Sequence, residues 1–254
     1  MNLVGTILIY VALATSFLGA VSVVRPWTLI GITSRPYGVA VLLSGVVVFL
    51  VGVILPAPEK KIAEKTTILD DFVPEYQFAE SHTIRIAAPR ERVFVAIREV
   101  TANEITFFRT LTWIRRFGRP GPESILNPPP HEPILAVATR AGFMKLAEEP
   151  DRELVLGTLV VAPPGWWPNK DKKPTPEDFK ALHAPGFALA AINFRVEDAT
   201  KGETLLTTET RIYATDASAK RKFAGYWRTI YPGSALIRVM WLRAIRRRAE
   251  SDNL

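Results

Sequence analysis

Few residues in this chain combine the chemistry and the spacing of a catalytic or metal-binding site. The sequence has no cysteine, and its three histidines, His82, His131 and His183, fall on a predicted strand and in two separate loops. A zinc site or a nucleophile with its base would need such side chains to converge. The chain also lacks a glycine-rich phosphate loop and an HExxH helix. We therefore expect no catalytic residue, no metal and no cofactor.

One charged pair is placed to interact. Glu209 and Arg211 lie two positions apart on a predicted strand, so their side chains share a face. A cross-strand ion pair at the surface is the simpler interpretation. A buried pair that orients a ligand remains open, and it would require complete pairing because isolated charge is costly away from water.

The strand predicted from Phe187 onward has an apolar face that suits a hydrophobic ligand. Ala188, Ala190, Ile192 and Phe194 alternate with residues that point the other way. The two alanines leave volume that larger side chains would fill, and the next strand adds hydroxyl groups. An apolar cleft with a few hydroxyls is typical of a lipid-like ligand pocket.

The residues expected to line this pocket come from two strands and two helices. They are Phe108, Ala188, Ala190, Ile192, Phe194, Thr208, Thr210 and Trp227. The alternative is a fully packed core without a cavity, and the sequence leaves both open.

Two uncharged segments, 3–24 and 37–55, precede the rest of the chain. About 20 apolar residues suffice for a helix to cross a membrane, so we predict a transmembrane hairpin over residues 1–56. Trp27 lies in the connecting loop, where an aromatic anchor at the headgroup level is expected. A secretory signal peptide is less favoured, because no basic residue precedes the first apolar run.

Small residues recur every seven positions on both predicted helices, at Gly5, Ala12 and Gly19 and at Gly38, Gly45 and Gly52. Such a stripe lets helix backbones approach closely. The two stripes can pack against each other, or one can receive a helix of another subunit.

Aromatic residues in a proline-rich loop form another candidate contact. Trp166 and Trp167 lie between Pro164 and Pro168, close to several lysines. Exposed aromatic side chains usually contact something, so either the membrane, a partner or the domain itself should cover them. The residues expected to contact the membrane or a partner are Gly5, Ala12, Gly19, Trp27, Gly38, Gly45, Gly52, Trp166 and Trp167.

Charge favours a cytoplasmic location for the part after the hairpin. The net charge is +7, and Lys60, Lys61 and Lys65 follow the second apolar segment, against Arg25 and Arg35 in the loop. The positive-inside rule then gives a weak bias toward the cytoplasm. Basic residues beside anionic headgroups fit the same location. Nucleic acid is not an expected partner, because no recognition motif accompanies the basic residues.

The order of predicted elements indicates an α+β fold. A membrane-surface linker is predicted over 57–81, followed by a domain at 82–254. This domain should begin with a strand at 82–87, a helix from about Pro89 to Thr101 and a second helix over 104–117. Strands are predicted at 134–145, 152–161, 187–196 and 204–214, and a helix over 217–250 interrupted near Pro232. An antiparallel sheet wrapped on the long C-terminal helix would bury these surfaces.

The segment 82–94, HTIRIAAPRERVF, resembles the start of START-like domains, the helix-grip domains of the polyketide-cyclase and lipid-transfer superfamily called SRPBCC. The segments 208–211 and 223–227 are also similar to bacterial members. The resemblance implies a helix-grip fold and hardly specifies an activity. The predicted hairpin is a departure from the soluble members, and it argues against a freely diffusing ligand carrier.

These observations support three functional hypotheses. The first is a non-enzymatic, membrane-anchored START-like domain that binds a hydrophobic molecule such as a lipid, quinone or isoprenoid. The second is an accessory subunit of a larger membrane complex, with the domain as a docking scaffold. The third is a cyclase- or hydrolase-type enzyme. Membrane lipids, a hydrophobic small molecule and other integral membrane subunits are thus the expected partners.

Overall fold

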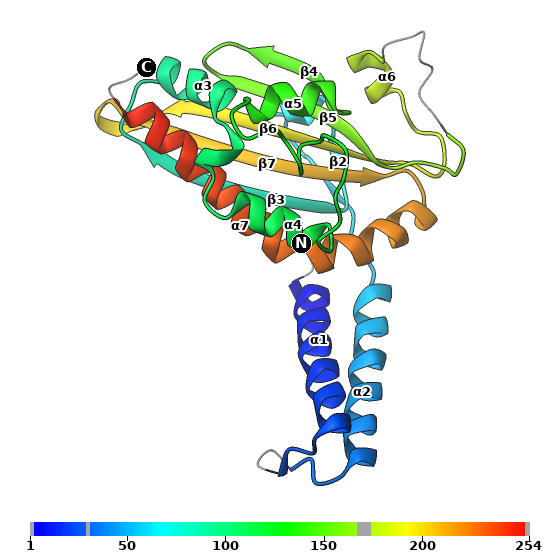
Figure 1. Cartoon of the computed structure of the whole chain (residues 1–254). Coiled ribbons are helices and arrows are strands. Elements are labelled where there is room, and N and C mark those ends of the chain that lie inside the picture. Colours follow the sequence, from blue (N-terminus) through cyan, green and yellow to red (C-terminus); the bar gives the residue numbers. More distant parts are fainter. Residues whose placement is uncertain (1–2, 29–30, 167–173, 252–254) are drawn as a thin grey trace. The chain divides into compact units, whose positions relative to one another are not determined.

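The computed structural model describes residues 3–28, 31–166 and 174–251. The chain divides into two compact units. One holds residues 1–58 together with 221–231, and the other holds residues 59–220 together with 232–254. The fold is α+β, with two apolar N-terminal helices, a five-stranded antiparallel sheet and a long C-terminal helix (Figure 1).

The first unit contains a helical hairpin of α1 (Leu3–Val24) and α2 (Arg35–Ile54). Both helices are long and apolar enough to cross a membrane. Their outward side chains are large and apolar, for example Phe17 at 68% exposure and Leu43 at 58%. An apolar surface of this kind suits lipid rather than water.

The small-residue stripes face each other inside this hairpin, except that Gly5 packs against the side chain of Arg228. Gly38, Gly45 and Gly52 are buried on α2, and Ala12 on α1 is completely buried. A Cβ atom at Gly19 would lie 2.3 Å from the backbone nitrogen of Leu42. The stripes therefore serve the packing of the hairpin itself, the first of the two alternatives that the sequence left open.

An arginine from the C-terminal helix caps α2. Arg228 is 3% exposed, and its guanidinium donates hydrogen bonds to the carbonyl oxygens of Gly52 (2.8 Å), Val53 (3.0 Å) and Leu55 (2.8 Å). The last carbonyls of a helix have no partner within it, and they carry its negative dipole end. Burial lowers the pKa of Arg228. Nearby, the Tyr10 hydroxyl donates to the carbonyl of Thr229 at 2.6 Å, so residues 221–231 are attached to the hairpin at two points.

The second unit is built on one antiparallel sheet with strand order β3-β7-β6-β5-β4. Its strands are β3 (Phe78–Ile86), β4 (Met144–Glu149), β5 (Glu153–Val161), β6 (Ala188–Asp198) and β7 (Thr204–Ala214). The short helix η4 (Thr200–Gly202) joins the two long strands β6 and β7, which pair from Ala188–Ala214 to Asp198–Thr204. The apolar alternation of β6 correctly predicts one continuous inner face.

The strand predicted at 134–145 is wrong up to residue 143. The structure has a helix there, α5 (Ile134–Arg140), and β4 begins only at Met144. Ile134, Leu135, Val137 and Ala138 are the buried residues of α5. This spacing follows a helical period rather than the alternation of a strand, and Pro133 precedes the helix where prolines are favoured.

Four helices cover the inner face of the sheet. Figure 1 shows α3 (Arg90–Glu99), α5 and α7 (Ala217–Glu250) on the same face. The helix α4 (Phe108–Arg115) follows the short helix η3 (Ala102–Glu104) and adds Phe108 to this core. From α7, the side chains of Ile237, Trp241 and Ile245 contribute to the same core.

The helix α7 runs without the predicted interruption, and Pro232 lies inside it. Proline lacks an N–H, so one backbone hydrogen bond is lost, but the flanking turns are continuous. Asp216 caps the start of α7, where its carboxylate accepts from Ser218 N at 2.6 Å and Ala219 N at 2.9 Å.

The outer face of the sheet is covered by residues 60–76 and by α6 (Pro176–Lys180). Residues 60–76, which belong to the predicted linker, contain β1 (Lys60–Lys61), η2 (Ile68–Asp71) and β2 (Glu75–Tyr76). The second apolar core lies here, and its buried members are Leu69, Val73, Leu146, Val155, Phe179, Phe187, Leu189 and Ala191. The sheet is therefore the middle of three layers.

Candidate functional site

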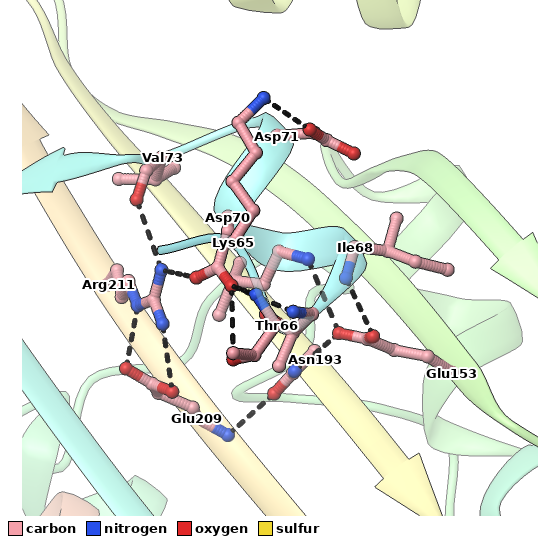
Figure 2. A network of polar contacts seen from close by, with 12 residues as sticks. Lys65, Thr66, Ile68, Asp70, Asp71, Val73, Glu153, Asn193, Glu209 and Arg211 are labelled. Carbon is pink, nitrogen blue, oxygen red and sulfur yellow. Dashed lines mark hydrogen bonds and ion pairs between the residues drawn. The ribbon is translucent and has the colours of Figure 1, made fainter. Parts of the chain in front are cut away.

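A buried ionic network lies beneath η2 on the outer face of the sheet (Figure 2). The Arg211 guanidinium is 2.5 Å from Asp70 Oδ1 and 2.6 Å from Glu209 Oε1. Its Nη1 also donates to the carbonyl of Val73 at 3.3 Å. The side chains of Arg211 and Asp70 are 5% and 1% exposed. The Glu209–Arg211 pair is thus covered by the chain itself, and its partners are structural.

Two further residues extend this network. Glu153, 1% exposed, accepts hydrogen bonds from the backbone nitrogens of Ile68 (2.8 Å) and Leu69 (3.3 Å) and from the Asn193 amide (2.6 Å). Asn193 in turn accepts from the backbone nitrogen of Glu209 at 2.8 Å. Glu153 and Arg211 therefore tie η2 to β5 and β7, and Asn193 links both strands through β6 (Figure 2).

The Asp70 carboxylate predicts a measurable pH dependence. Burial alone would raise its pKa, but hydrogen bonds from Thr66 N, Arg211 and Thr67 N lower that pKa from 3.8 to about 2. A group whose pKa is lower in the folded state stabilises the fold above the unfolded pKa and loses that effect as pH falls. Between pH 5 and pH 2 the stability advantage of the wild type over Asp70→Asn should shrink by about 1–2 kcal/mol, after allowance for solvent screening.

Denaturant unfolding of the detergent-solubilised chain at several pH values measures this effect. Asp71→Asn is the matched control, because Asp71 is the next residue and its 45% exposed side chain pairs with the exposed Lys65. The free energy of unfolding of Asp71→Asn should change with pH in parallel with that of the wild type. An advantage over Asp70→Asn that stays constant down to pH 2 would contradict the assignment.

A second polar cluster lies on the inner face, where the sequence predicts pocket-lining hydroxyls. Glu80 is 4% exposed, and it accepts hydrogen bonds from Ser234 (3.1 Å) and contacts His82 Nε2 at 2.7 Å. Arg238 from α7 donates to the Thr210 hydroxyl at 3.0 Å. Burial lowers the pKa of Arg238 to about 10, with Glu80 opposing the shift, so the guanidinium stays charged at neutral pH.

Two donors in this inner cluster are buried without a hydrogen-bond partner among the described residues. They are Arg238 Nη1 and Trp241 Nε1. The Arg238 guanidinium stacks on the Trp241 ring at 5.5 Å from its centroid. Both carboxylate oxygens of Glu80 are engaged, so the cluster places a satisfied acid beside an incompletely satisfied base.

The structure places the predicted pocket residues at different sites. Ala188, Ala190, Ile192 and Phe194 are buried on β6, at exposures from 0% to 8%. Phe194 contacts the Trp241 ring at 5.3 Å, and Phe108 belongs to the same core.

The two predicted hydroxyls already have partners, because Thr208 donates to the carbonyl of Asn193 at 2.8 Å and Thr210 accepts from Arg238. Trp227 belongs to the other unit.

A pocket of about 380 Å³ lies along α4 and the loop that follows it. Its lining residues are Phe108, Arg109, Thr110, Thr112, Trp113, Arg116, Leu126, Asn127 and Pro128. Asn127 fixes the loop by donating to the carbonyls of Gly121 (2.8 Å) and Pro122 (3.4 Å). Of the residues predicted to line a pocket, Phe108 is brought to this one.

Two arginines give this α4 pocket a positive wall. Arg116 Nη1 donates to the carbonyl of Arg119 at 2.9 Å, whereas its buried Nε has no hydrogen-bond partner among the described residues. Within the same part of the chain, no acidic side chain pairs with Arg109 or Arg116. Aromatic and aliphatic walls with an unneutralised guanidinium suit a ligand that has an apolar body and an anionic group.

Sequence reasoning missed this pocket. The signal is present, because the run 105–122 contains four arginines and no acidic residue, with aromatic residues between them. The spacing of Phe108 and Thr112, both buried, predicts a helix with one face inward. The return of the loop at 121–128, which brings residues 126–128 to the pocket, has no comparable pattern.

The predicted contact residues outside the stripes are partly exposed. Trp27 is 45% exposed in the loop of the hairpin, and Trp166 is 39% exposed. The Trp166 ring packs edge-on against Phe187 at 5.3 Å, so part of it is covered by the domain. Trp167 lies outside the described residues. Among those that are described, no group of three His, Cys, Asp or Glu side chains could hold a metal ion.

Comparisons with known proteins assign no family. No protein-family model matches the sequence, and no curated protein matches it. The structure is similar to that of a hypothetical protein, jhp0584, from Helicobacter pylori, with 10% sequence identity and a TM-score of 0.34. That match covers 74% of this chain and 97% of the other. A likeness at this level supports no functional argument.

Proposed function

We propose that this protein is a membrane-anchored START-like domain that binds a hydrophobic molecule with an anionic group at the membrane surface, without catalysing a reaction. The observation that carries the proposal is the α4 pocket, where apolar side chains such as Trp113 and Leu126 lie beside Arg109 and the Nε of Arg116, which has no hydrogen-bond partner among the described residues. The two apolar helices supply the anchor. The charge pattern of the chain favours a cytoplasmic location for the domain.

The size of the pocket restricts the ligand. A volume of about 380 Å³ is near the lower end of small-molecule pockets. It suits the headgroup and upper chain of a lipid, or a short isoprenoid acid or phosphate, with the remainder of the molecule outside. A neutral quinone is disfavoured, because it would leave the buried Nε of Arg116 without a charged partner.

The arrangement gives little support to an enzyme. Glu80 is the buried acid of the inner cluster, but Ser234 and His82 already occupy its oxygens. The α4 pocket is lined by no carboxylate, histidine or cysteine. The accessory-subunit hypothesis also loses its main support, since the glycine stripes contact each other within the hairpin.

Native mass spectrometry of the gently extracted full-length protein tests the proposal. The wild type should carry an anionic apolar species. Arg109→Gln should reduce its occupancy by about tenfold or more, because a hydrogen bond to a charged group contributes about 1.5–3 kcal/mol. Arg90→Gln is the control, since Arg90 is also exposed on a helix but pairs with Asp198 at 3.0 Å.

Two results would contradict the proposed function. One is a wild-type protein that is reproducibly empty when extracted from its own membrane. The other is a bound species whose occupancy falls equally in Arg90→Gln and Arg109→Gln. A species that is lost only in Arg109→Gln, and whose mass identifies an acidic lipid, would support it.

A further inference from the structure

The helix α4 and the turns at its ends expose four large apolar side chains. Phe107 is 62% exposed, Trp113 56%, Ile114 55% and Phe117 87%. Phe107 and Ile114 are seven residues apart, which is close to two helical turns, so they lie on one side. A cluster of large exposed apolar side chains on one short segment is uncommon unless it contacts something.

The backbone holds two of these aromatic residues in an unfavourable conformation. Phe107 has φ = 60° and Phe117 has φ = 54°. A bulky residue rarely adopts the left-handed region, and such strain persists where the surrounding structure enforces it. Because Phe117 is almost fully exposed, packing of its ring does not offset that strain. Each end of α4 therefore combines a strained backbone with an exposed aromatic ring.

The charge of the segment is entirely positive. Arg109, Arg115, Arg116 and Arg119 lie among the aromatic residues, and no acidic residue occurs from Ile105 to Pro122. Arg119 is exposed, and no acidic side chain in the described part of the chain pairs with it. Elsewhere on the domain, exposed arginines such as Arg140 and Arg152 have carboxylate partners.

We propose that the α4 face, defined as Phe107, Trp113, Ile114 and Phe117 with Arg119, inserts into the surface of an anionic bilayer. Aromatic rings favour the headgroup level, and arginines favour anionic lipid phosphates. A basic segment with exposed aromatic side chains is typical of an interfacial helix. The inference rests on the proposed membrane attachment of the chain, and it does not depend on what the pocket binds.

A second copy of the same chain is a poorer occupant. A two-fold contact would bring together two copies of the segment 105–122, which holds four arginines and no acidic residue, and like charges across an interface are repulsive. An anionic lipid surface instead supplies both the counter-charge and the apolar environment.

The test uses the full-length protein in nanodiscs of phosphatidylcholine, alone or with phosphatidylserine. The chain has no cysteine, so Ile114→Cys can carry a single fluorescent NBD group. Lipids with a doxyl quencher then report whether this position lies in the bilayer. Thr200→Cys, in the turn between β6 and β7, carries the control label. We expect strong quenching at position 114 that increases with phosphatidylserine, and weak quenching at position 200.

Second substitutions separate the two components of the α4 face. Phe117→Ser should reduce quenching at position 114 by about half or more. Arg119→Glu should raise the phosphatidylserine fraction at which the same quenching is reached by about twofold or more. The matched controls are Val95→Ser, an exposed apolar residue of α3 at 41% exposure, and Arg85→Glu, an exposed arginine of β3. Both controls should leave the quenching unchanged.

Several results would overturn the inference. One is quenching at position 114 that is no stronger than at position 200, and another is a Phe117→Ser variant with the same quenching as Val95→Ser. If the NBD group at position 114 is shielded from water at high protein concentration in detergent but is not quenched by lipid, the α4 face contacts a second copy of the chain. A protein that retains its pocket species in native mass spectrometry while position 114 stays unquenched refutes this inference and leaves the proposed function intact.

Discussion

Replacing Arg211 with methionine is expected to lower the free energy of unfolding by about 3–5 kcal/mol. Methionine preserves much of the side-chain volume but removes the cation between Asp70 and Glu209. Two carboxylates would then face each other, one of them 1% exposed, without a positive partner. Breaking a buried ion pair by removing one partner is much more costly than losing an exposed pair.

Denaturant unfolding followed by circular dichroism measures the loss, and trypsin digestion locates it. Arg211 holds η2 to the sheet through Asp70 and the carbonyl of Val73. In Arg211→Met the segment around η2 should open first, so that cleavage after Lys65 becomes faster than in the wild type. The exposed Lys61 should gain less, because it lies outside the ionic network.

Arg195→Met is a matched control for this experiment. Arg195 lies on the neighbouring strand β6 and forms the same kind of i, i+2 pair, with Glu197 at 2.9 Å. Its side chain and that of its partner are 27% and 43% exposed, and among the described residues no second carboxylate forms an ion pair with Arg195. Its loss should have a small effect. Equal destabilisation by the two substitutions would show that burial under η2 does not increase the contribution of Arg211 to the free energy of unfolding.

The ionic network shows what a sequence pattern can and cannot predict. The spacing of Glu209 and Arg211 correctly places both on one face of a strand. Asp70 is separated from Arg211 by 141 positions, and it belongs to a stretch without apolar periodicity. That the stretch folds onto the sheet depends on long-range contacts, such as those of Glu153 with Ile68 and Leu69, which no local pattern specifies.

The candidate pocket shows the same limit. Alternation along β6 predicts its inner face correctly, because period-2 burial is a local property. Whether helices fill the space above that face depends on volumes contributed by α3, α4, α5 and α7, and here Phe194 meets Trp241. The pocket instead lies along α4, where the loop at 121–128 returns. Aromatic and arginine residues in 107–119 could have indicated a surface site, but not its shape.

Gly19→Leu is expected to separate the two helices of the hairpin. A Cβ atom at Gly19 would lie 2.3 Å from the backbone nitrogen and 2.6 Å from the Cα of Leu42. Backbone atoms cannot move aside as a flexible side chain does, so the helices must part by about 2 Å or more to accept a leucine. Close backbone approach is the main source of packing energy between helices in lipid, and the hairpin should lose stability.

Spin labels at Phe17→Cys and Leu43→Cys measure this separation by double electron–electron resonance in nanodiscs. Both positions are exposed on the outside of the hairpin, and the chain has no other cysteine that could react. The distance distribution should shift to longer values and broaden in Gly19→Leu. Ala20→Leu is the control, because Ala20 is the next residue on α1 but is exposed. An unchanged distribution in Gly19→Leu, or an equal shift in Ala20→Leu, would mean that the glycine stripe does not hold the helices together. A shift confined to Gly19→Leu would also explain why such substitutions cannot test partner binding, since they alter the anchor itself.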